Sequence, residues 1–336
     1  MERRFGTEIR PLEEGDLKER PDTFQNDEDG YATAVQIMTW CMLHPEGDSN
    51  PHYAFRNMNP DSERWAGIVR TGDTYMGVQT SAHHQDIAKV GDDFLHYGKI
   101  ADGRYGMSCK EPFFSWDFGT KDATWKEGDI LDLKFEYFPF AKIAHYDAQH
   151  PFYIGQMYHY TGTYEGKPVS GFGGLDRVYK TTSYQCDWVQ RWFYVISSGM
   201  GYRPDGRIEF FEVSLFEGNG TGTAVYWLEG EEPIFTDEVY MDAVWEKLSY
   251  APEEDHTVTY KEAVWRFADK VIHVNNKWGT KGFTEKPRME KVGQSQSFGT
   301  WYVGDEPYEH TDNFSFNENS AVTIEKMEEL GFKVIR

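Results

Sequence analysis

A carboxylate closes a glycine-rich run near the middle of the chain. Asp176 follows Gly171, Gly173 and Gly174, which leave room for a second backbone or a ligand to approach closely. A carboxylic acid that burial keeps neutral, set against aromatic faces, can protonate carbon and so add or remove water at an isolated double bond. Asp176 is therefore a candidate general acid. The structural alternative is an ion pair with the adjacent Arg177, or a turn cap at the end of a strand.

The segment before this run has the alternation of a strand and holds a candidate histidine. His159 shares one face with Met157 and Thr161, and Tyr158 and Tyr160 share the other. Strict alternation admits only one of these sets into an interior. We expect His159 to point inward, with a structural or rim position as the alternative.

Two histidine-containing segments are considered for metal binding, and in neither does the spacing of the side chains suit a shared metal ion. His83 and His84 are adjacent in Ser81–Asp86 and would point to opposite faces of a strand. His145–His150 offers no third ligand at a suitable distance. The sequence therefore predicts no metal site, and we expect His83 and Tyr75 to contact a substrate instead.

The pattern of the whole chain is that of an antiparallel β protein. From Tyr31 onward, short segments of roughly 5 to 10 residues are bounded by Gly, Asp, Asn or Pro. Asp129–Tyr137 alternates apolar and polar residues as a half-buried strand does. Hairpin turns are expected at Asp102-Gly103, Glu165-Gly166, Asp205-Gly206 and Glu217–Gly220. The fold class is thus all-β, with a closed barrel or a sandwich in each half.

Helices are expected to be rare. A short C-terminal helix is predicted, with Ser320 as its cap and Gly331 at its end. Asp237–Leu248 fits a strand as well as a helix. The length of 336 residues suits two domains. We expect a charged lead-in over residues 1–30, a first domain over 31–180 and a second over 185–336.

The hairpin around Asp176 resembles a known family. A strand with His159, a turn at Glu165-Gly166 and the run Val169–Asp176 are similar to the junction motif of the lipocalin-like two-domain carotenoid hydratases (hydroxyneurosporene synthases). The same family includes kievitone-type hydratases, Diels–Alder cyclases and survival-factor-like proteins. The resemblance implies two consecutive lipocalin-like (calycin) barrels, and acid–base roles for Asp176 and, more loosely, His159. Most members continue with His or Asn and then Trp, whereas this chain has Arg177-Val178-Tyr179.

Composition excludes several function classes. The net charge is −22 and no stretch gathers Lys and Arg, so we expect no nucleic acid partner. No apolar run reaches the roughly 18 to 20 residues of a membrane span, and the expected location is the cytoplasm. Cys41, Cys109 and Cys186 are expected to be reduced. No phosphate loop, Gly-x-Ser-x-Gly or HExxH motif is present, so no cofactor is predicted.

The leading hypothesis is a cofactor-independent lyase-type enzyme, a hydratase, dehydratase, isomerase or cyclase, acting on a hydrophobic or aromatic small molecule in a barrel. Asp176 would be the general acid and His159 its partner. The expected substrate-binding residues are Tyr158, Tyr160, Tyr75, His83, Arg177 and Trp192. One alternative is a binding protein for a lipid-like ligand without chemistry, favoured by the departure at Arg177. The other is a carbohydrate-active β-sandwich, for which Asp117 beside Trp116 is a starting point.

Overall fold

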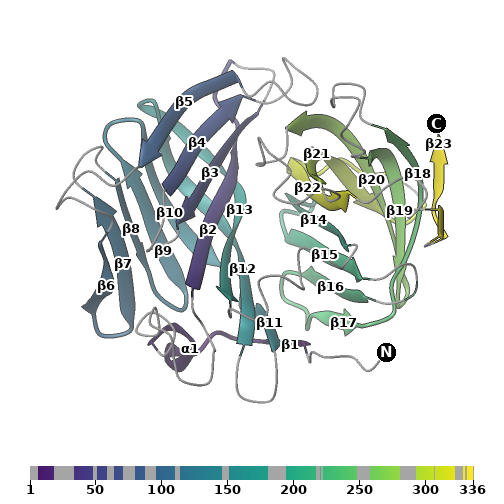
Figure 1. Ribbon diagram of the computed structural model, residues 1–336, viewed down its shortest axis with the longest axis horizontal. Helices are drawn as coiled ribbons and strands as arrows, with labels where there is room; N and C mark the ends of the chain where they lie inside the picture. Colours follow the sequence, from purple (N-terminus) through teal and green to yellow (C-terminus); the bar gives the residue numbers. More distant parts are fainter. Residues whose placement is uncertain are drawn as a thin grey trace. The chain divides into compact units, whose positions relative to one another are not determined.

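The protein consists of two compact units of β-sheet, in which the strands pair antiparallel except for β18 with β23 (Figure 1). The computed structural model describes residues 7–18, 34–47, 51–58, 64–70, 80–87, 96–109, 114–145, 151–180, 194–216, 220, 222–247, 258–280, 293–305, 307–321, 328–329 and 331–335. Strands β1 to β13 lie in the first unit and β14 to β23 in the second, apart from Thr80 at the start of β5.

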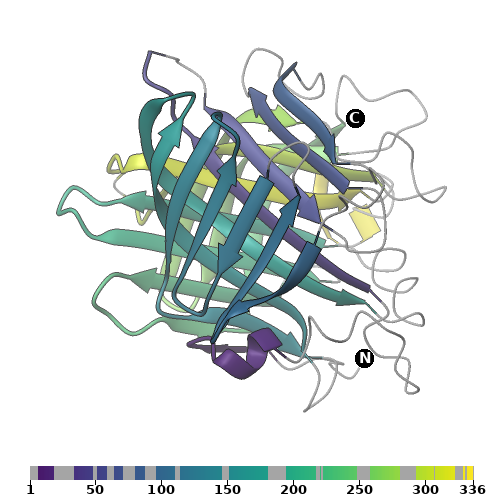
Figure 2. The same ribbon diagram turned by 90° about the vertical axis from the view of Figure 1, so that its left-hand side faces the viewer.

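A 13-stranded sheet makes up the first unit, and its strands curl around one another in Figures 1 and 2. Its strands are β1 (Thr7–Arg10), β2 (Ala34–Leu43), β3 (His52–Met58), β4 (Arg64–Arg70), β5 (Thr80–Ile87), β6 (His96–Ala101), β7 (Arg104–Cys109), β8 (Phe114–Phe118), β9 (Asp122–Glu127), β10 (Leu131–Tyr137), β11 (Ala141–His145), β12 (Pro151–Tyr164) and β13 (Lys167–Lys180). The main path runs β5-β4-β3-β2-β13-β12-β10-β9-β8-β7-β6, and β11 pairs with β12 and β1.

Alternation places the hydrophobic core on one face of this sheet, here called the inner face. In β10, Leu131, Leu133 and Phe135 are buried while the residues between them are exposed. The core continues along the inner faces of β2, β8, β9, β12 and β13. The expected turns at Asp102-Gly103, Glu165-Gly166 and Asp205-Gly206 join strands, with a positive φ of 68° at Gly103, 75° at Gly166 and 86° at Gly206. Residues 217–219 of the fourth expected turn lie outside the described residues. The period-two patterning of the sequence is therefore confirmed.

The N-terminal residues expected to be a solvated lead-in are folded in part. β1 pairs antiparallel with β11, and α1 (Glu14–Lys18) follows it at one end of the sheet (Figure 2). Leu12 packs against the core, and Arg10 donates to both carboxylate oxygens of Asp16 at 2.7 and 2.8 Å. The expectation that the fold begins near Tyr31 was wrong. β1 is held by backbone hydrogen bonds to β11, which do not require the apolar periodicity by which a strand is recognised in a sequence.

The second unit is a 10-stranded sheet in the order β17-β16-β15-β14-β22-β21-β20-β19-β18-β23. Its strands are β14 (Tyr194–Tyr202), β15 (Ile208–Phe216), β16 (Gly222–Leu228), β17 (Ile234–Thr236), β18 (Tyr240–Lys247), β19 (Val258–Phe267), β20 (Lys270–Thr280), β21 (Gly293–Val303), β22 (Thr311–Ala321) and β23 (Lys333–Ile335). Its core includes Trp245, Trp265 and Trp301, each almost completely buried.

Two open questions of the sequence are resolved in this unit. The ambiguous segment Asp237–Leu248 contains strand β18. Ser320 belongs to β22 rather than capping a helix. Residues 328–329 are helical, and Gly331 follows with a φ of 90° and a hydrogen bond to the carbonyl of Glu328.

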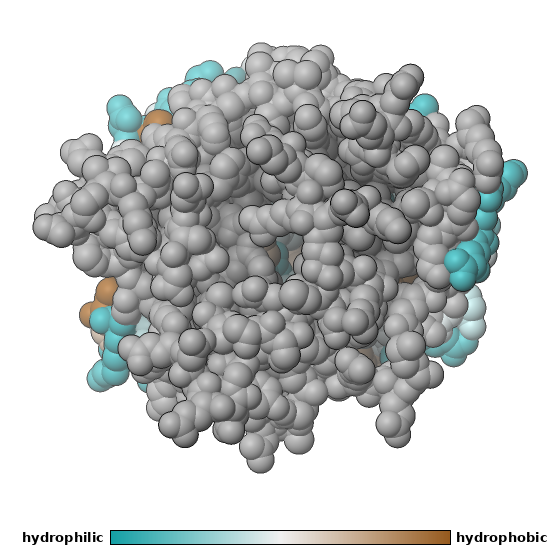
Figure 3. All heavy atoms as spheres, in the orientation of Figure 1, coloured by the Kyte–Doolittle hydropathy of each residue, from teal (hydrophilic) through white to brown (hydrophobic). Residues whose placement is uncertain are grey.

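Few large hydrophobic side chains are exposed in the described part of the chain. On the face in Figure 3, the described residues at the edges are mostly hydrophilic, and hydrophobic ones occur in small groups. The large hydrophobic side chains that are exposed in the described part of the chain are Ile100, Phe235, Tyr240 and Val244. No helix in that part is long and apolar enough to cross a membrane.

Candidate functional site

The ribbon formed by β12 and β13 carries most of the predicted site residues and divides them between its two faces. Tyr158 and Tyr160 belong to the buried core and so define the inner face. Because residues alternate along a strand and directly paired residues share a face, Arg177 joins them there. Asp176 and His159 project from the outer face. The expectation that His159 points inward was therefore wrong, since the two tyrosines occupy the interior.

The glycines opposite the two tyrosines make room for the tyrosine rings. Tyr158 and Tyr160 donate their hydroxyl hydrogens to backbone carbonyls of β2, at 2.7 and 2.5 Å. To reach them the rings cross β13 at Gly173 and Gly171. A Cβ at Gly173 would lie 2.7 Å from the Tyr158 hydroxyl oxygen and 2.2 Å from the carbonyl oxygen of Trp40. The space that these glycines leave is thus filled by the protein's own side chains.

Asp176 is a half-buried acceptor on the outer face. One carboxylate oxygen accepts from the indole Nε1 of Trp40 at 3.1 Å, and the other accepts from the Tyr153 hydroxyl at 2.5 Å. Gly174 and Gly155 allow this, because a Cβ at either position would lie within 2.5 Å of the Trp40 ring or the Tyr153 hydroxyl, respectively. The carboxylate therefore joins β2, β12 and β13. The suggested ion pair with the next residue is not formed, since that side chain lies on the opposite face.

His159 does not contact Asp176. Its Nε2 lies 3.0 Å from a carboxylate oxygen of Glu136, and its side chain is 28% exposed. In the register His159 is opposite Phe172, so a length of strand of roughly 13 Å separates it from Asp176. The predicted acid–base pair is therefore not assembled in this structure.

Arg177 is a buried charged residue on the inner face of the first unit. The residue is 2% exposed, and its guanidinium carbon lies 5.0 Å from the centroid of the Phe118 ring. Nη1 donates to the side-chain oxygen of Gln156 at 2.8 Å. Among the described residues, Nε and Nη2 have no hydrogen-bond partner, and no carboxylate forms an ion pair with Arg177. A buried cation with unused donors is costly, because water no longer solvates it.

Other unpaired donors lie in the same buried, aromatic region. The Tyr137 hydroxyl and the Trp116 indole Nε1 have no partner within the described part of the chain. Burial raises the pKa of Tyr137, and the nearby Arg177 charge opposes this rise, so the phenol stays neutral. Trp116 packs against Phe118 with centroids 5.2 Å apart. Arg177, Gln156, Tyr137, Trp116 and Phe118 are called the Arg177 site below.

Aromatic rings and the N-terminal segment border this site. The Phe135 and Tyr158 rings stack with centroids 4.1 Å apart, and Tyr137 meets Tyr158 edge to face at 6.1 Å. Burial works to raise the pKa of Asp16 in α1, but hydrogen bonds from Arg10 and the charges of Arg10 and Arg177 lower it overall. The Arg177 site is therefore near the end of the sheet where α1 lies.

Tyr137 and Gln156 are site residues that the sequence analysis did not single out. The alternation of inner and outer residues along each strand could have identified them. Tyr137 shares the face of Leu131 in β10, and Gln156 shares the face of Tyr158 in β12. A polar residue on a face otherwise committed to the core marks either an internal hydrogen bond or a ligand contact.

Several predicted residues lie outside what the structure describes. Tyr75 and Trp192 are outside the described residues, as are His150 and Cys186. His83 lies in β5, but its side chain is not described. No group of three metal-ligating side chains occurs among the described residues. Cys41 is buried in the core of the first unit.

The residues suggested for a carbohydrate site have structural contacts. Trp116 is fully buried and cannot present its ring to a sugar. Asp117 pairs with Arg104 at 2.5 Å, and the same arginine pairs with Asp122. A carbohydrate cleft needs an exposed aromatic ring beside an unpaired carboxylate, and Trp116 and Asp117 provide neither.

The second unit has its own buried carboxylate, Glu209, on the core face of β15. It accepts hydrogen bonds from the hydroxyls of Tyr226 and Tyr308, from His310 Nε2 at 2.7 Å and from Arg203 at 3.2 Å. Burial alone would raise the pKa of Glu209, but the hydrogen bonds from His310 and the two tyrosines lower it overall. Its charge is thus fully satisfied, which indicates a structural role.

The tautomer of His310 follows from a neighbouring amide. Asn313 accepts from the backbone N–H of Trp301 at 3.1 Å and donates to its carbonyl at 2.9 Å, which fixes the amide orientation. The same amide nitrogen lies 3.2 Å from His310 Nδ1, so Nδ1 must accept and the ring proton must sit on Nε2. His310 therefore donates to Glu209 through Nε2.

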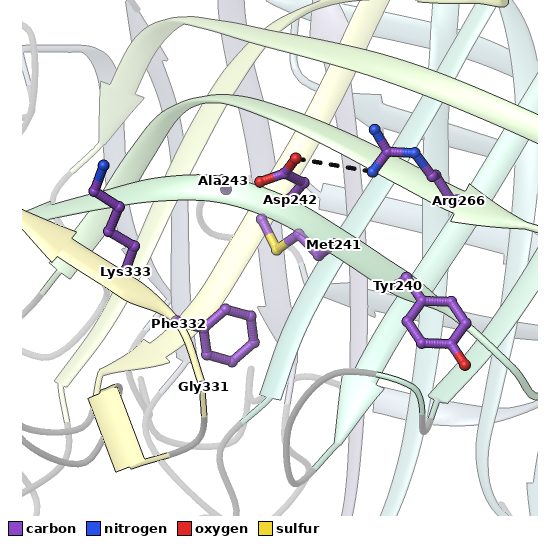
Figure 4. A pocket seen from close by; sticks show the side chains of 8 residues that line it. All are labelled: Tyr240, Met241, Asp242, Ala243, Arg266, Gly331, Phe332 and Lys333. Atoms are coloured by element: carbon purple, nitrogen blue, oxygen red, sulfur yellow. Dashed lines mark ion pairs between the residues drawn. The ribbon is translucent and has the colours of Figure 1, made fainter.

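A pocket of about 320 Å³ lies between β18 and β23 (Figure 4). It is lined by Tyr240, Met241, Asp242, Ala243, Arg266, Gly331, Phe332 and Lys333. Arg266 and Asp242 face each other across 3.9 Å, but their side chains are 49% and 77% exposed. Such a solvated pair holds its partners weakly, so this pocket is a poorer candidate than the buried Arg177 site.

No protein-family model matches the chain, and no curated protein matches it in sequence. Two solved structures resemble it in fold. A candidate AttH from Nitrosomonas europaea has a TM-score of 0.45 and 12% identity, covering 90% of this chain and 96% of its own. Kievitone hydratase from Nectria haematococca has a TM-score of 0.45 and 7% identity, covering 87% of this chain and 90% of its own.

Proposed function

We propose that the first unit binds a hydrophobic or aromatic small molecule at the Arg177 site. The observation that carries the proposal is a guanidinium buried to 2% exposure whose Nε and Nη2 have no partner among the described residues. Buried polar groups in folded proteins are nearly always hydrogen-bonded, so an unpaired set points to a partner supplied from outside the chain.

The surroundings support a small organic ligand rather than a macromolecule. Phe118, Trp116 and Tyr158 provide flat apolar surfaces, and Tyr137 provides a hydroxyl without a partner in the described interior. Ligand sites commonly combine a mostly apolar lining with a few convergent polar groups that fix orientation. Leaving a buried donor unpaired costs about 1–3 kcal/mol, more if it is charged, and a ligand would recover this cost.

The test is native mass spectrometry of the purified protein, followed by denaturing extraction of what it retains. We expect one small molecule per chain in the wild type and in Arg266→Met, which alters the surface pocket of Figure 4. We expect its loss in Arg177→Met, which keeps an unbranched apolar stem and removes all donors. Equal retention by both variants would place the ligand elsewhere.

Lyase-type chemistry is a second candidate function, favoured by the 2.5 Å hydrogen bond between Tyr153 and Asp176. The Asp176 carboxylate in this pair is half-buried. The pair contains the expected general acid, with Tyr153 in place of His159 as its hydrogen-bond partner. It acts on the outer face, so it requires a substrate distinct from one held at Arg177. Full turnover by Asp176→Asn of a substrate that the wild type converts would rule out this candidate, whereas loss of that turnover with normal folding would support it.

A further inference from the structure

The two unused donors of Arg177 lie on the same edge of its guanidinium. Nε–H and the adjacent N–H of Nη2 point in parallel, whereas Nη1, which lies on the other side, donates to Gln156. The free pair therefore forms a fork of two parallel donors. A fork of this kind matches the two oxygens of a carboxylate in a bidentate arrangement.

The charge balance around the site also calls for an anion. The neighbouring carboxylates are already engaged: Asp16 accepts from Arg10 at both oxygens, and Asp117 and Asp122 pair with Arg104. The ion pairs within the described residues leave Arg177 without one. A buried cation is tolerated when an anion compensates it and fills its donors.

Among anions, a carboxylate fits better than a phosphate. The guanidinium carbon lies over the Phe118 ring, and the rings of Trp116 and Tyr158 border the region. A ligand in this region must therefore carry its charge next to an apolar body. A monovalent, planar group balances the single charge of Arg177. A phosphate monoester would bring up to two charges and a third strong acceptor oxygen into an apolar interior.

Resting on the proposed function, we propose that the ligand is a carboxylic acid with an aromatic or conjugated body, held as its carboxylate by Nε and Nη2 of Arg177. The Tyr137 hydroxyl is free to donate a further hydrogen bond. Gln156 is a positioning residue: by accepting from Nη1 it turns the donor fork toward the ligand.

The experiment compares acid and ester forms of the same molecule on protein stripped of co-purifying ligand. The probes are cinnamic acid with methyl cinnamate, and the conjugated polyene parinaric acid with its methyl ester. Calorimetry and probe fluorescence report the dissociation constants. We expect at least one acid to bind wild type roughly tenfold or more tightly than its ester, because only the acid can pair with the buried charge.

Variants of Arg177 assign the preference to this residue. In Arg177→Met the acid should lose roughly tenfold to a hundredfold in affinity while the ester changes little, since the charge and the fork are both absent. Arg177→Lys keeps the charge without the fork, and we expect an intermediate preference. If these variants do not fold, the acid–ester comparison in the wild type still decides the ligand class.

The outcomes separate the two proposals. Equal affinity for acid and ester, or an acid preference that survives Arg177→Met in folded protein, overturns the carboxylate assignment and leaves the ligand site intact. Binding of no probe by stripped protein that also retained no ligand on purification overturns the proposed function itself. A phosphate-bearing molecule recovered on extraction would overturn the choice of carboxylate.

Discussion

At the scale of single residues, side-chain direction decides which groups can act together. Asp176 and Arg177 are adjacent in sequence yet lie on opposite faces of β13, one half-buried beside Trp40 and the other deep in the interior. The sequence indicated both as functional candidates. It did not reveal which face was inside, because His159 and the tyrosines on either side of it fit the interior equally well by pattern.

Tyr137 offers a test at this scale. In Tyr137→Phe a buried hydroxyl without a described partner is removed while the ring remains, so the ligand-free protein should be as stable or more stable by about 1 kcal/mol. Ligand affinity should fall severalfold at the same time. Urea unfolding of stripped protein and calorimetry with the extracted ligand measure the two effects. A loss of stability would show that the hydroxyl has an internal partner.

At the scale of elements, the glycine-rich strand β13 shows what sequence pattern does and does not predict. Its strand character, its hairpin and the turn at Glu165-Gly166 followed from residue types, since Gly166 has the positive φ that turn requires. The purpose of its glycines did not follow. They accommodate rings from β12 and β2, and such contacts between strands distant in sequence depend on a register that residue types alone do not fix.

A substitution in β13 tests this account. In Gly173→Ala the new methyl would lie 2.2 Å from the carbonyl oxygen of Trp40, so backbone must shift and the Tyr158 hydrogen bond must weaken. We expect a loss of about 2–4 kcal/mol in the free energy of unfolding. Gly15→Ala in α1, with open space around its Cβ position, is the matched control and should be neutral or slightly stabilising.

The N-terminal elements are a case in which residue types did not predict the secondary structure. Neither β1 nor α1 was expected, because the segment is charged and has little apolar periodicity. Its order comes from backbone pairing with β11 and from the Arg10–Asp16 ion pair. Contacts of this kind are made across the fold, so they are visible only once β11 is in place.

At the scale of the whole molecule, two buried charged residues, one from each unit, differ in how fully their hydrogen-bonding groups are used. Glu209 in the second unit is surrounded by four donors, whereas Arg177 in the first has one acceptor among the described residues. The contrast indicates that Glu209 has its full set of partners within the chain, whereas Nε and Nη2 of Arg177 have none among the described residues. The two charged residues are therefore expected to differ in role, Glu209 being structural and Arg177 open to a ligand.

The stability of the second unit should depend on pH through Glu209. Because its pKa in the folded state is below the ordinary value of 4.5, its stabilising contribution is fully present above that value and is lost as pH falls through the folded pKa. In Glu209→Gln we expect a loss of about 1–3 kcal/mol at about pH 7 and a shrinking difference from wild type toward about pH 3. Urea midpoints across this range measure it, and a constant difference would contradict it.

The amide of Asn313, clamped to the backbone of Trp301, has a consequence for spectroscopy. Because this amide occupies Nδ1 of His310, the ring proton lies on Nε2, between the buried imidazole and the buried Glu209 carboxylate. That proton should therefore exchange slowly with solvent. A ¹⁵N-labelled sample should then show an imidazole N–H resonance, shifted downfield by its 2.7 Å bond to Glu209, that persists in water. Its disappearance on warming would mark opening of this end of the sheet before global unfolding, giving a local reporter that needs no added probe.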